Sequence, residues 1–574
     1  MALIAAILMA VACATTASLL MAMAWGHLTT GVAALSLCAG ILLGGWVFSF
    51  CRRRNLERLT LTSFDWVICF FFLLFCFRQF SWVYYRKDGG LYTLLRHNFG
   101  DLPLHLSYIQ NFVAGGEFWP KNPFFTGENL HYAFGADLFS ALFVKLGAPL
   151  LSVIPALSWF LGLLTLAALL FWGRGFALGA FLFSTGIAGY EALISGVLKD
   201  YQTELAWRSI PLTLLVPQRG FQYAFPAGLI LLWSWRSRFL RNDKEALPTW
   251  IEGLLWGTMP LFHLHTFLAL SFVFLAWVIC RGKLKEGLPI FLWAVVPATF
   301  EVWSLTDAFG KASIIGWKPG WMMENQNPFL FFITNFGFLI PLIFFAIPFA
   351  LRSEEAEHRW LLFPALILWG VCFFVMFAPW DWDNMKVMVW CALLMFPVFG
   401  ALIERTLRPR WRAWVYGLLF FSGGVSIYSE HVHTNGGQRI AEAAEVDGVC
   451  HALKSLPARG RVATAQSHNH SVSLCGYPMT AGFNGWLWAH GIQAGPVEKK
   501  LKRLMQGDPA WRTLARELET RYLFWGHRER DAYKDGTRPW ETQAAKVAEG
   551  EWGAIYDLEP VAPDDPSHSM EPVP

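Results

Sequence analysis

The chain has 574 residues, of which 55% are hydrophobic, 16% aromatic and only 15% charged. This composition excludes a water-soluble globular protein, and a net charge of +4 without a basic domain argues against nucleic-acid binding. Repeated apolar stretches of about 17–25 residues predict transmembrane helices, to which the 50 Phe and 30 Trp supply lipid-facing and interfacial side chains.

The pattern predicts an α-helical polytopic membrane protein of about 13 spans. The first stretch lacks a basic leading region, so we interpret it as a retained span rather than a cleaved signal peptide. Segment 133–147 is short and contains Asp137 and Lys145, so we expect a membrane-skimming helix or partial span there. The spans are expected near residues 4–24, 31–50, 64–84, 150–172, 176–196, 221–235, 249–262, 265–280, 288–306, 328–350, 359–378, 386–404 and 412–428.

Basic residues cluster in short loops, which marks those loops as cytoplasmic. The clusters are Arg52, Arg53, Arg54 and Arg58; Arg174; Arg236, Arg238, Arg241 and Lys244; Arg281, Lys283 and Lys285; Arg352 and Arg359; and Arg405, Arg408, Arg410 and Arg412. With 13 spans the N-terminus is then cytoplasmic, and the loops 85–149, 197–220, 307–327 and 379–385 lie outside. Compact loops without eukaryotic sorting signals favour a bacterial inner membrane.

The composition changes sharply toward polar residues near residue 429. We therefore expect two domains, a membrane domain over 1–428 and an extracytoplasmic α/β domain over 429–574, with a disordered end from Pro560 to Pro574. Cys450 and Cys475 lie in this tail and could form a disulfide if it faces an oxidising compartment. The chain offers no CxxC motif in support, so two unpaired thiols are the alternative.

Asp101 is the first candidate for chemistry, in the stretch Arg96-His97-Asn98-Phe99-Gly100-Asp101-Leu102-Pro103-Leu104-His105. Gly100 and Pro103 predict that this acid lies in a turn at the membrane surface. A carboxylate there can act as a general base, as a metal ligand or as an ordinary solvated side chain. His105 is a candidate to orient it, and the loop Asn122-Pro123-Phe124-Phe125-Thr126-Gly127-Glu128-Asn129-Leu130-His131-Tyr132 follows.

Two further segments place charges at predicted membrane boundaries, where ionisable groups are costly and are usually functional or paired. In Trp380-Asp381-Trp382-Asp383-Asn384-Met385-Lys386, the lysine could bind a phosphate, while mutual pairing of Asp383 and Lys386 is the alternative. Arg219 could likewise bind a phosphate through its planar guanidinium, or anchor a helix at the lipid interface. Asp381, Asp383 and His131 are candidates for binding an acceptor or a divalent ion, Mg²⁺ or Mn²⁺.

The tail contains loops rich in Gly, Asn, Trp and His, a composition frequent where proteins contact ligands. The candidates there are His468, His470, Asn484, Trp486 and His490. Surface histidines without a ligand are the alternative, because the chain has no HExxH motif and no Cys/His spacing typical of a zinc site.

The chain resembles the GT-C superfamily of membrane glycosyltransferases in three features. An acid follows an early span, and it lies in a long outer loop that ends in Pro-x-Phe-x-Gly-x-x-Leu-x-Tyr. Many further spans and an outer tail come after this loop. The resemblance covers residues 64–428 as architecture and about 35 residues as motif. It implies a polyprenyl-phosphate sugar as donor, with Asp101 at the position of the family's catalytic acid.

Together these features lead to the hypothesis of an inverting glycosyltransferase on the outer face. Asp101 would act as base, Arg219 and Lys386 would hold the donor phosphate, and the acceptor would be a lipid, a glycan or a protein. The expected partners are membrane lipids and the lipid-linked sugar. Two alternatives remain, a transporter or flippase of lipid-linked glycans and a non-catalytic protein of cell-envelope assembly.

Overall fold

The structure is a computed structural model that describes residues 1–52, 59–243, 246–306, 315–433 and 436–559. Two compact units make up the chain: unit 1 comprises 1–119 and 131–440, and unit 2 comprises 120–130 and the residues from 441. The predicted boundary near 429 therefore falls at 440, and a piece of the first long loop belongs to unit 2. The predicted disordered end and the basic residues Arg53, Arg54, Arg58 and Lys244 lie outside the described residues.

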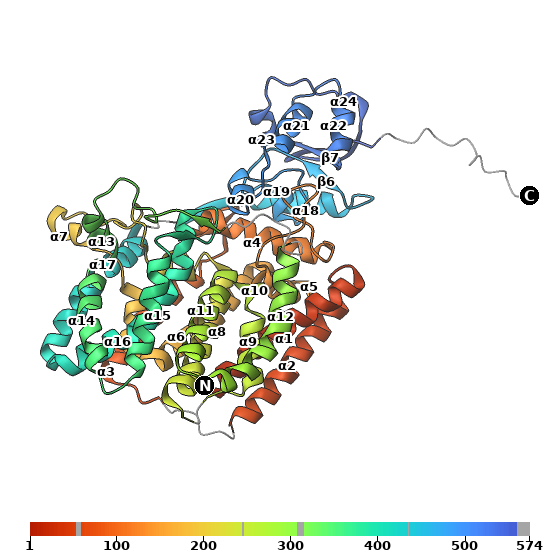
Figure 1. Cartoon of the computed structure of the whole chain (residues 1–574). Helices are drawn as coiled ribbons and strands as arrows, with labels where there is room; N and C mark the ends of the chain where they lie inside the picture. Colours follow the sequence, from red (N-terminus) through yellow and green to blue (C-terminus); the bar gives the residue numbers. More distant parts are fainter. Residues whose placement is uncertain (53–58, 244–245, 307–314, 434–435, 560–574) are drawn as a thin grey trace, which may run out of the picture. The chain divides into compact units, whose positions relative to one another are not determined.

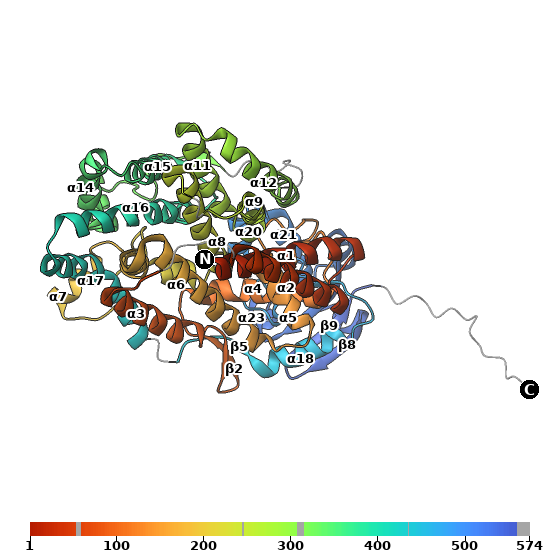
Figure 2. The same cartoon turned by 90° about the horizontal axis from the view of Figure 1, so that it is seen from below.

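Unit 1 is a bundle of apolar helices (Figures 1 and 2). Its α-helices are α1 (Ala2–Trp25), α2 (Thr30–Arg52), α3 (Ser63–Phe80), α4 (Asn98–Val113), α5 (Gly135–Lys145), α6 (Leu150–Phe183), α7 (Glu191–Ser195), α8 (Arg219–Trp235), α9 (Thr249–Gly257), α10 (Met259–Phe262), α11 (Leu264–Cys280), α12 (Leu284–Leu305), α13 (Pro328–Phe336), α14 (Leu339–Arg352), α15 (Glu357–Val371), α16 (Met385–Thr406) and α17 (Pro409–His433). Short helical turns cover Ala188–Tyr190, Pro211–Leu215, Arg236–Arg241 and Asp381–Asn384.

Within the described ranges, six helices are long and apolar enough to cross a membrane, or seven if α13 and α14, which meet at a 91° bend, count as one span. The chain is thus an integral membrane protein, but the predicted count of 13 spans is not reproduced. One reason is that predicted spans are broken: segment 249–262 divides into α9 and α10, and α15 ends at Val371. Helix α5 has 11 residues, about 16 Å, and is too short to cross.

One buried acid, Asp65, stabilises both the start of α3 and the break in α6. Asp65 forms a capping box with Thr62 at the start of α3. The same carboxylate accepts a hydrogen bond of 2.6 Å from the backbone N–H of Gly175. At this point α6 is interrupted by non-helical backbone at Gly173 and Arg174, where the sequence predicts a turn between two spans.

Two small β-sheets complete unit 1 and lead into unit 2. Strands β1 (Tyr85–Lys87) and β2 (Gly90–Thr93) form an antiparallel hairpin joined by β5 (Gln438–Glu442), and β3 (Gly316–Trp317) pairs antiparallel with β4 (Val375–Met376). Unit 2 contains a four-stranded sheet in the order β6-β7-β9-β8, from β6 (Arg461–Ala463), β7 (Thr520–Gly526), β8 (Ala545–Gly550) and β9 (Gly553–Asp557).

The sheet of unit 2 is mixed, because β6 pairs parallel with β7 whereas β9 pairs antiparallel with both β7 and β8. Its helices are α18 (Ala443–Lys454), α19 (Ser471–Leu474), α20 (Asn484–Ala489), α21 (Gly495–Met505), α22 (Trp511–Glu517), α23 (His527–Ala532) and α24 (Trp540–Gln543). Cys450 and Cys475 form a disulfide with their Cα atoms 5.1 Å apart. Unit 2 thus combines seven helices with a four-stranded mixed sheet in the residues that the structure describes.

Candidate active site

Asp101 lies in the first turn of α4 rather than in the predicted turn. The helix accommodates Pro103 near its N-terminus, and an acid in the first turn interacts favourably with the helix dipole. Its Oδ2 accepts a hydrogen bond of 3.1 Å from Nε2 of Gln218, which immediately precedes α8. Burial raises the pKa of Asp101, while the charges of His105 and Lys386 favour the carboxylate.

His105 follows Asp101 by one helical turn and so lies on the same side of α4. It is 2% exposed, and its Nδ1 lies 2.9 Å from Oδ2 of Asp137 in α5. Arg219 also contacts Asp137, with its Nε 3.3 Å from Oδ1 of that acid. The Nη2 of Arg219 donates a 2.7 Å hydrogen bond to Oγ of Ser140. This arrangement holds the imidazole of His105 in one orientation.

Arg219, a predicted phosphate ligand, is only 3% exposed and lies among the side chains of α5. Asp137, an acid of the short segment 133–147 that is not among the predicted site residues, is 1% exposed and pairs with both Arg219 and His105. The signal for Asp137 is present in the sequence, since an acid in an apolar segment requires a partner. The identity of that partner depends on the packing of α4, α5 and α8.

Lys386 lies in the first turn of α16. Its Nζ is 3.1 Å from Oδ2 of Asp383, and both side chains are 14% exposed. The charges of both residues act on Asp101, which places them near it. His265, at the start of α11, also lies within the electrostatic reach of Lys386 and Asp383.

Asp381 and His131 have other neighbours. Asp381 forms an ion pair with Lys318, and its carbonyl accepts a 2.8 Å hydrogen bond from the indole of Trp321. Nδ1 of His131 lies 2.9 Å from the carbonyl oxygen of Leu305, at the end of α12. The cluster around Asp101 therefore combines Gln218, His105, Asp383 and Lys386.

The tail candidates divide into buried and surface residues of unit 2. Nε2 of the buried His470 lies 3.0 Å from Oε1 of the buried Glu529, and Trp486 is buried with its ring 4.9 Å from that of Phe124. His468 packs edge-on against Phe483 at 5.5 Å between ring centroids. Asn484 is the first residue of α20 and His490 directly follows its last, and both are more exposed. His470 and Trp486 thus contribute to the core of unit 2.

The backbone N–H groups of Ala465 and Gly526 donate to the two carboxylate oxygens of Glu529. Burial opposes ionisation of this acid, but His470 and these hydrogen bonds hold its pKa below the ordinary value. The pair therefore orders the loop before α19 against the start of α23.

A separate polar cavity of about 650 Å³ in unit 1 contains a group of side chains with metal-ligating atoms. His97, Asp200 and Glu430 each offer one ligand atom, and these three atoms lie within 4.8 Å of one another. Nε2 of His97 is 3.8 Å from Oδ2 of Asp200. One imidazole nitrogen and two carboxylate oxygens suit Mn²⁺ better than Mg²⁺, which prefers oxygen ligands.

Several solved structures, including the following two, are similar to this chain, whereas no family model and no curated protein sequence matches it. The cryo-EM structure of the arabinofuranosyltransferase AftD from Mycobacteria aligns with this chain at 14% identity and a TM-score of 0.48. The alignment covers 87% of this chain but only 40% of AftD. The archaeal oligosaccharyltransferase AglB from Archaeoglobus fulgidus, in complex with an inhibitory peptide and a dolichol-phosphate, aligns at 11% identity and a TM-score of 0.40, covering 81% of this chain and 69% of AglB.

Both neighbours are named as glycosyl-transferring proteins, the class that the resemblance of the first outer loop to the GT-C superfamily implies. At 14% and 11% identity and with TM-scores below 0.5, these neighbours do not by themselves assign a function to this chain.

Proposed function

We propose that this protein is an inverting membrane glycosyltransferase that moves one sugar from a polyprenyl phosphate to an extracytoplasmic acceptor. The observation that carries the proposal is the position of Asp101, a carboxylate of raised pKa that is hydrogen-bonded to Gln218 and lies in the field of Lys386. A raised pKa makes a carboxylate a stronger base, and a nearby ammonium group can stabilise a departing phosphate.

In this mechanism Asp101 removes the proton of an acceptor hydroxyl. The acceptor oxygen attacks the anomeric carbon from the side opposite the phosphate, and the bond between that carbon and the phosphate oxygen breaks. The bonding electrons leave with the polyprenyl phosphate, whose charge Lys386 stabilises. His105 is assigned a positioning role because Asp137 and Arg219 fix its ring one turn from Asp101.

The proposed orientation follows from two helices that carry site residues at one end and basic residues at the other. Arg219 begins α8 and Arg236 follows its last residue, about 25 Å away, and Lys386 and Arg405 are similarly separated along α16. The positive-inside rule then assigns the Asp101 end to the extracytoplasmic face. The Cys450–Cys475 disulfide supports an oxidising environment for unit 2.

The first experiment measures sugar transfer from a labelled polyprenyl-phosphate sugar by detergent-solubilised protein. Asp101→Asn should lower the rate at least about 100-fold, because the amide cannot accept the proton. Asp88→Asn is the matched control, since Asp88 is a 79% exposed acid of the same loop, and it should leave the rate unchanged. Full activity in Asp101→Asn would remove this residue from the mechanism.

The detergent assay also separates transfer from transport. Glycosyl transfer proceeds without a sealed membrane, whereas a flippase or transporter produces no measurable change when the two sides are not separated. Absence of transfer in detergent together with lipid-linked glycan movement in sealed proteoliposomes would favour the transporter.

We further propose that His97, Asp200 and Glu430, rather than Asp381 and Asp383, bind a divalent cation. Asp381 and Asp383 already pair with Lys318 and Lys386.

Binding of Mn²⁺ to chelator-treated protein, followed by electron paramagnetic resonance, tests this assignment. His97→Ala removes one of the three ligands and should weaken Mn²⁺ binding at least about tenfold, since loss of even an outer-shell partner commonly has an effect of this size. Asp381→Asn should not weaken Mn²⁺ binding. The reverse pattern would place the cation at Asp381.

A further inference from the structure

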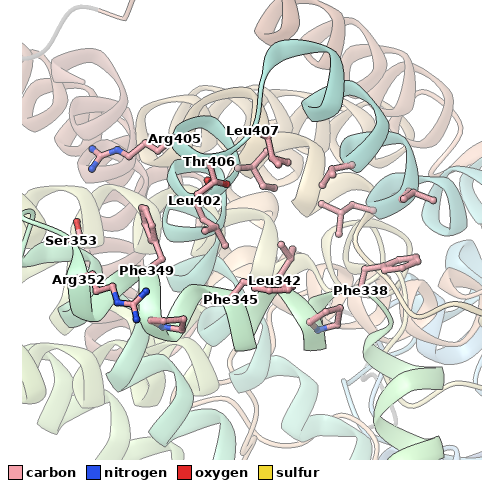
Figure 3. A pocket seen from close by; sticks show the side chains of 16 residues that line it. Phe338, Leu342, Phe345, Phe349, Arg352, Ser353, Leu402, Arg405, Thr406 and Leu407 are labelled. Carbon is pink, nitrogen blue, oxygen red and sulfur yellow. The ribbon is translucent and has the colours of Figure 1, made fainter.

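An apolar groove runs along α14, between this helix and the parts of α16 and α17 that face it (Figure 3). The groove has a volume of about 710 Å³, and its walls are almost entirely hydrocarbon. Phe345 is 65% exposed and Leu418 47% exposed, so the groove opens on the surface of unit 1. Its lining includes Leu342, Phe345, Phe349, Leu402 and Leu418.

One end of the groove is polar and positively charged. Arg352, Ser353 and Arg405 lie there, and Figure 3 shows these three at the end away from Phe338. Arg405 forms an ion pair with Glu355, which neutralises its charge. Arg352 is exposed and forms no ion pair among the residues that the structure describes, so its guanidinium is available to bind an anion.

The helix that lines the groove is longer than the hydrocarbon of one membrane leaflet is thick, so an acyl chain can lie along it. Helix α14 has 14 residues and is therefore about 21 Å long, compared with about 15 Å for half of the hydrocarbon core. Arg405 lies near the C-terminal end of α16, whereas Lys386 lies near its N-terminal end, about 28 Å away. The groove is thus separated from the candidate active site by most of the thickness of a bilayer.

We infer that this groove binds an anionic phospholipid of the leaflet at the arginine end. Its acyl chain lies along α14 among the aromatic and aliphatic side chains, and its phosphate accepts hydrogen bonds from the guanidinium of Arg352. Charge selects the ligand, because a headgroup of net negative charge compensates Arg352 whereas a zwitterionic headgroup carries its own cation. The binding site is independent of the proposed glycosyl transfer and lies at the other end of the same helices.

Native mass spectrometry of the full chain, released from detergent with phosphatidylglycerol or phosphatidylcholine added at equal concentration, tests the inference. The wild-type protein should retain one phosphatidylglycerol more tightly than phosphatidylcholine. Arg352→Gln should weaken retention of phosphatidylglycerol about tenfold, the loss expected for one charge-assisted hydrogen bond. Arg410→Gln is the matched control, because Arg410 is an exposed arginine in the first turn of α17 that does not line the groove, and it should retain the lipid.

A second pair of variants keeps the test valid if Arg352→Gln folds poorly. Arg352→Lys preserves the charge and should retain most of the selectivity, whereas Leu342→Trp narrows the groove and should reduce binding of both lipids. Equal retention of the two lipids by the wild-type protein would overturn the inference. Displacement of phosphatidylglycerol by an equimolar polyprenyl phosphate would overturn it as well, since the groove would then be a donor-lipid site.

Discussion

At the scale of single residues, the chemistry of Asp101 is set by opposing influences. Removal from water favours the neutral acid, and the nearby Asp383 acts in the same direction. His105, Lys386 and the hydrogen bond from Gln218 favour the carboxylate. The raised pKa that results from this balance makes Asp101 a stronger base than an ordinary aspartate.

The raised pKa of Asp101 predicts where kcat/KM should decline on the acid side of its pH profile. Since the base must be deprotonated, kcat/KM should fall as the pH decreases through the raised pKa of Asp101, at a higher pH than for an ordinary aspartate. Gln218→Leu removes a hydrogen bond that favours the carboxylate, so its acid limb should move to still higher pH. The measurement is kcat/KM against pH for the two proteins.

Lys87→Met is the control for this profile, because Lys87 is a half-exposed cation of β1 in the same outer loop. Its acid limb should coincide with that of the wild-type protein. If the acid limb of kcat/KM for Gln218→Leu lay at lower pH than that of the wild-type protein, Asp101 would not be the titrating base.

At the scale of elements, the close packing of helix pairs depends on small residues. Helices α1 and α2 pack along each other, as both views show (Figures 1 and 2). Gly40 and Gly44 of α2 have the GxxxG spacing and face Ala6, Ala10 and Ala14 of α1. A Cβ atom at Gly40 would lie 2.9 Å from the Cβ of Ala14, so the two backbones approach more closely than larger side chains allow.

Gly40→Leu should therefore destabilise the helix pair by about 1–3 kcal/mol, the usual cost of overpacking. Thermal unfolding in detergent measures the effect. Gly45→Leu is the control, because a Cβ atom at Gly45 meets open space, and this variant should unfold at the wild-type temperature. Equal unfolding temperatures for both variants would show that the close approach at Gly40 contributes nothing to stability.

At the scale of the whole molecule, the chain is organised into a helical membrane unit and an α/β unit that also includes residues 120–130. This segment hydrogen-bonds within unit 2, where Met479 donates to the carbonyl of Pro123 at 2.7 Å and Gly482 donates to that of Phe124 at 2.7 Å. If unit 2 is extracytoplasmic, the long loop that contributes this segment must be extracytoplasmic too.

Cysteine labelling of intact cells tests this orientation. Asp88→Cys, in the first outer loop, should react with a membrane-impermeant maleimide from outside, whereas Arg410→Cys should react only after permeabilisation. Labelling in the opposite pattern would invert the proposed topology and place Asp101 on the cytoplasmic side.

Much of this organisation is predictable because it depends on local properties of the sequence. Long apolar segments predict the membrane unit, and the change in composition predicts a separate polar unit, although its boundary lies at 440 rather than 429. The region of Asp101 stands out because an acid and a histidine one turn apart follow an apolar segment. Such signals depend on neighbours within a few residues and can be read without knowledge of packing.

The partners of these residues were decided only by the tertiary structure. Gln218 is 117 positions from Asp101, and Asp137 is 32 positions from His105. Arg219 has the sequence context of a surface anchor, but packing against α5 buries it beside Asp137. Sequence periodicity reports which face of a helix is apolar, not which helix will cover it. The sequence therefore determined the membrane character and the candidate acid, whereas folding selected the surrounding charges, because those charges come from helices far apart in the chain.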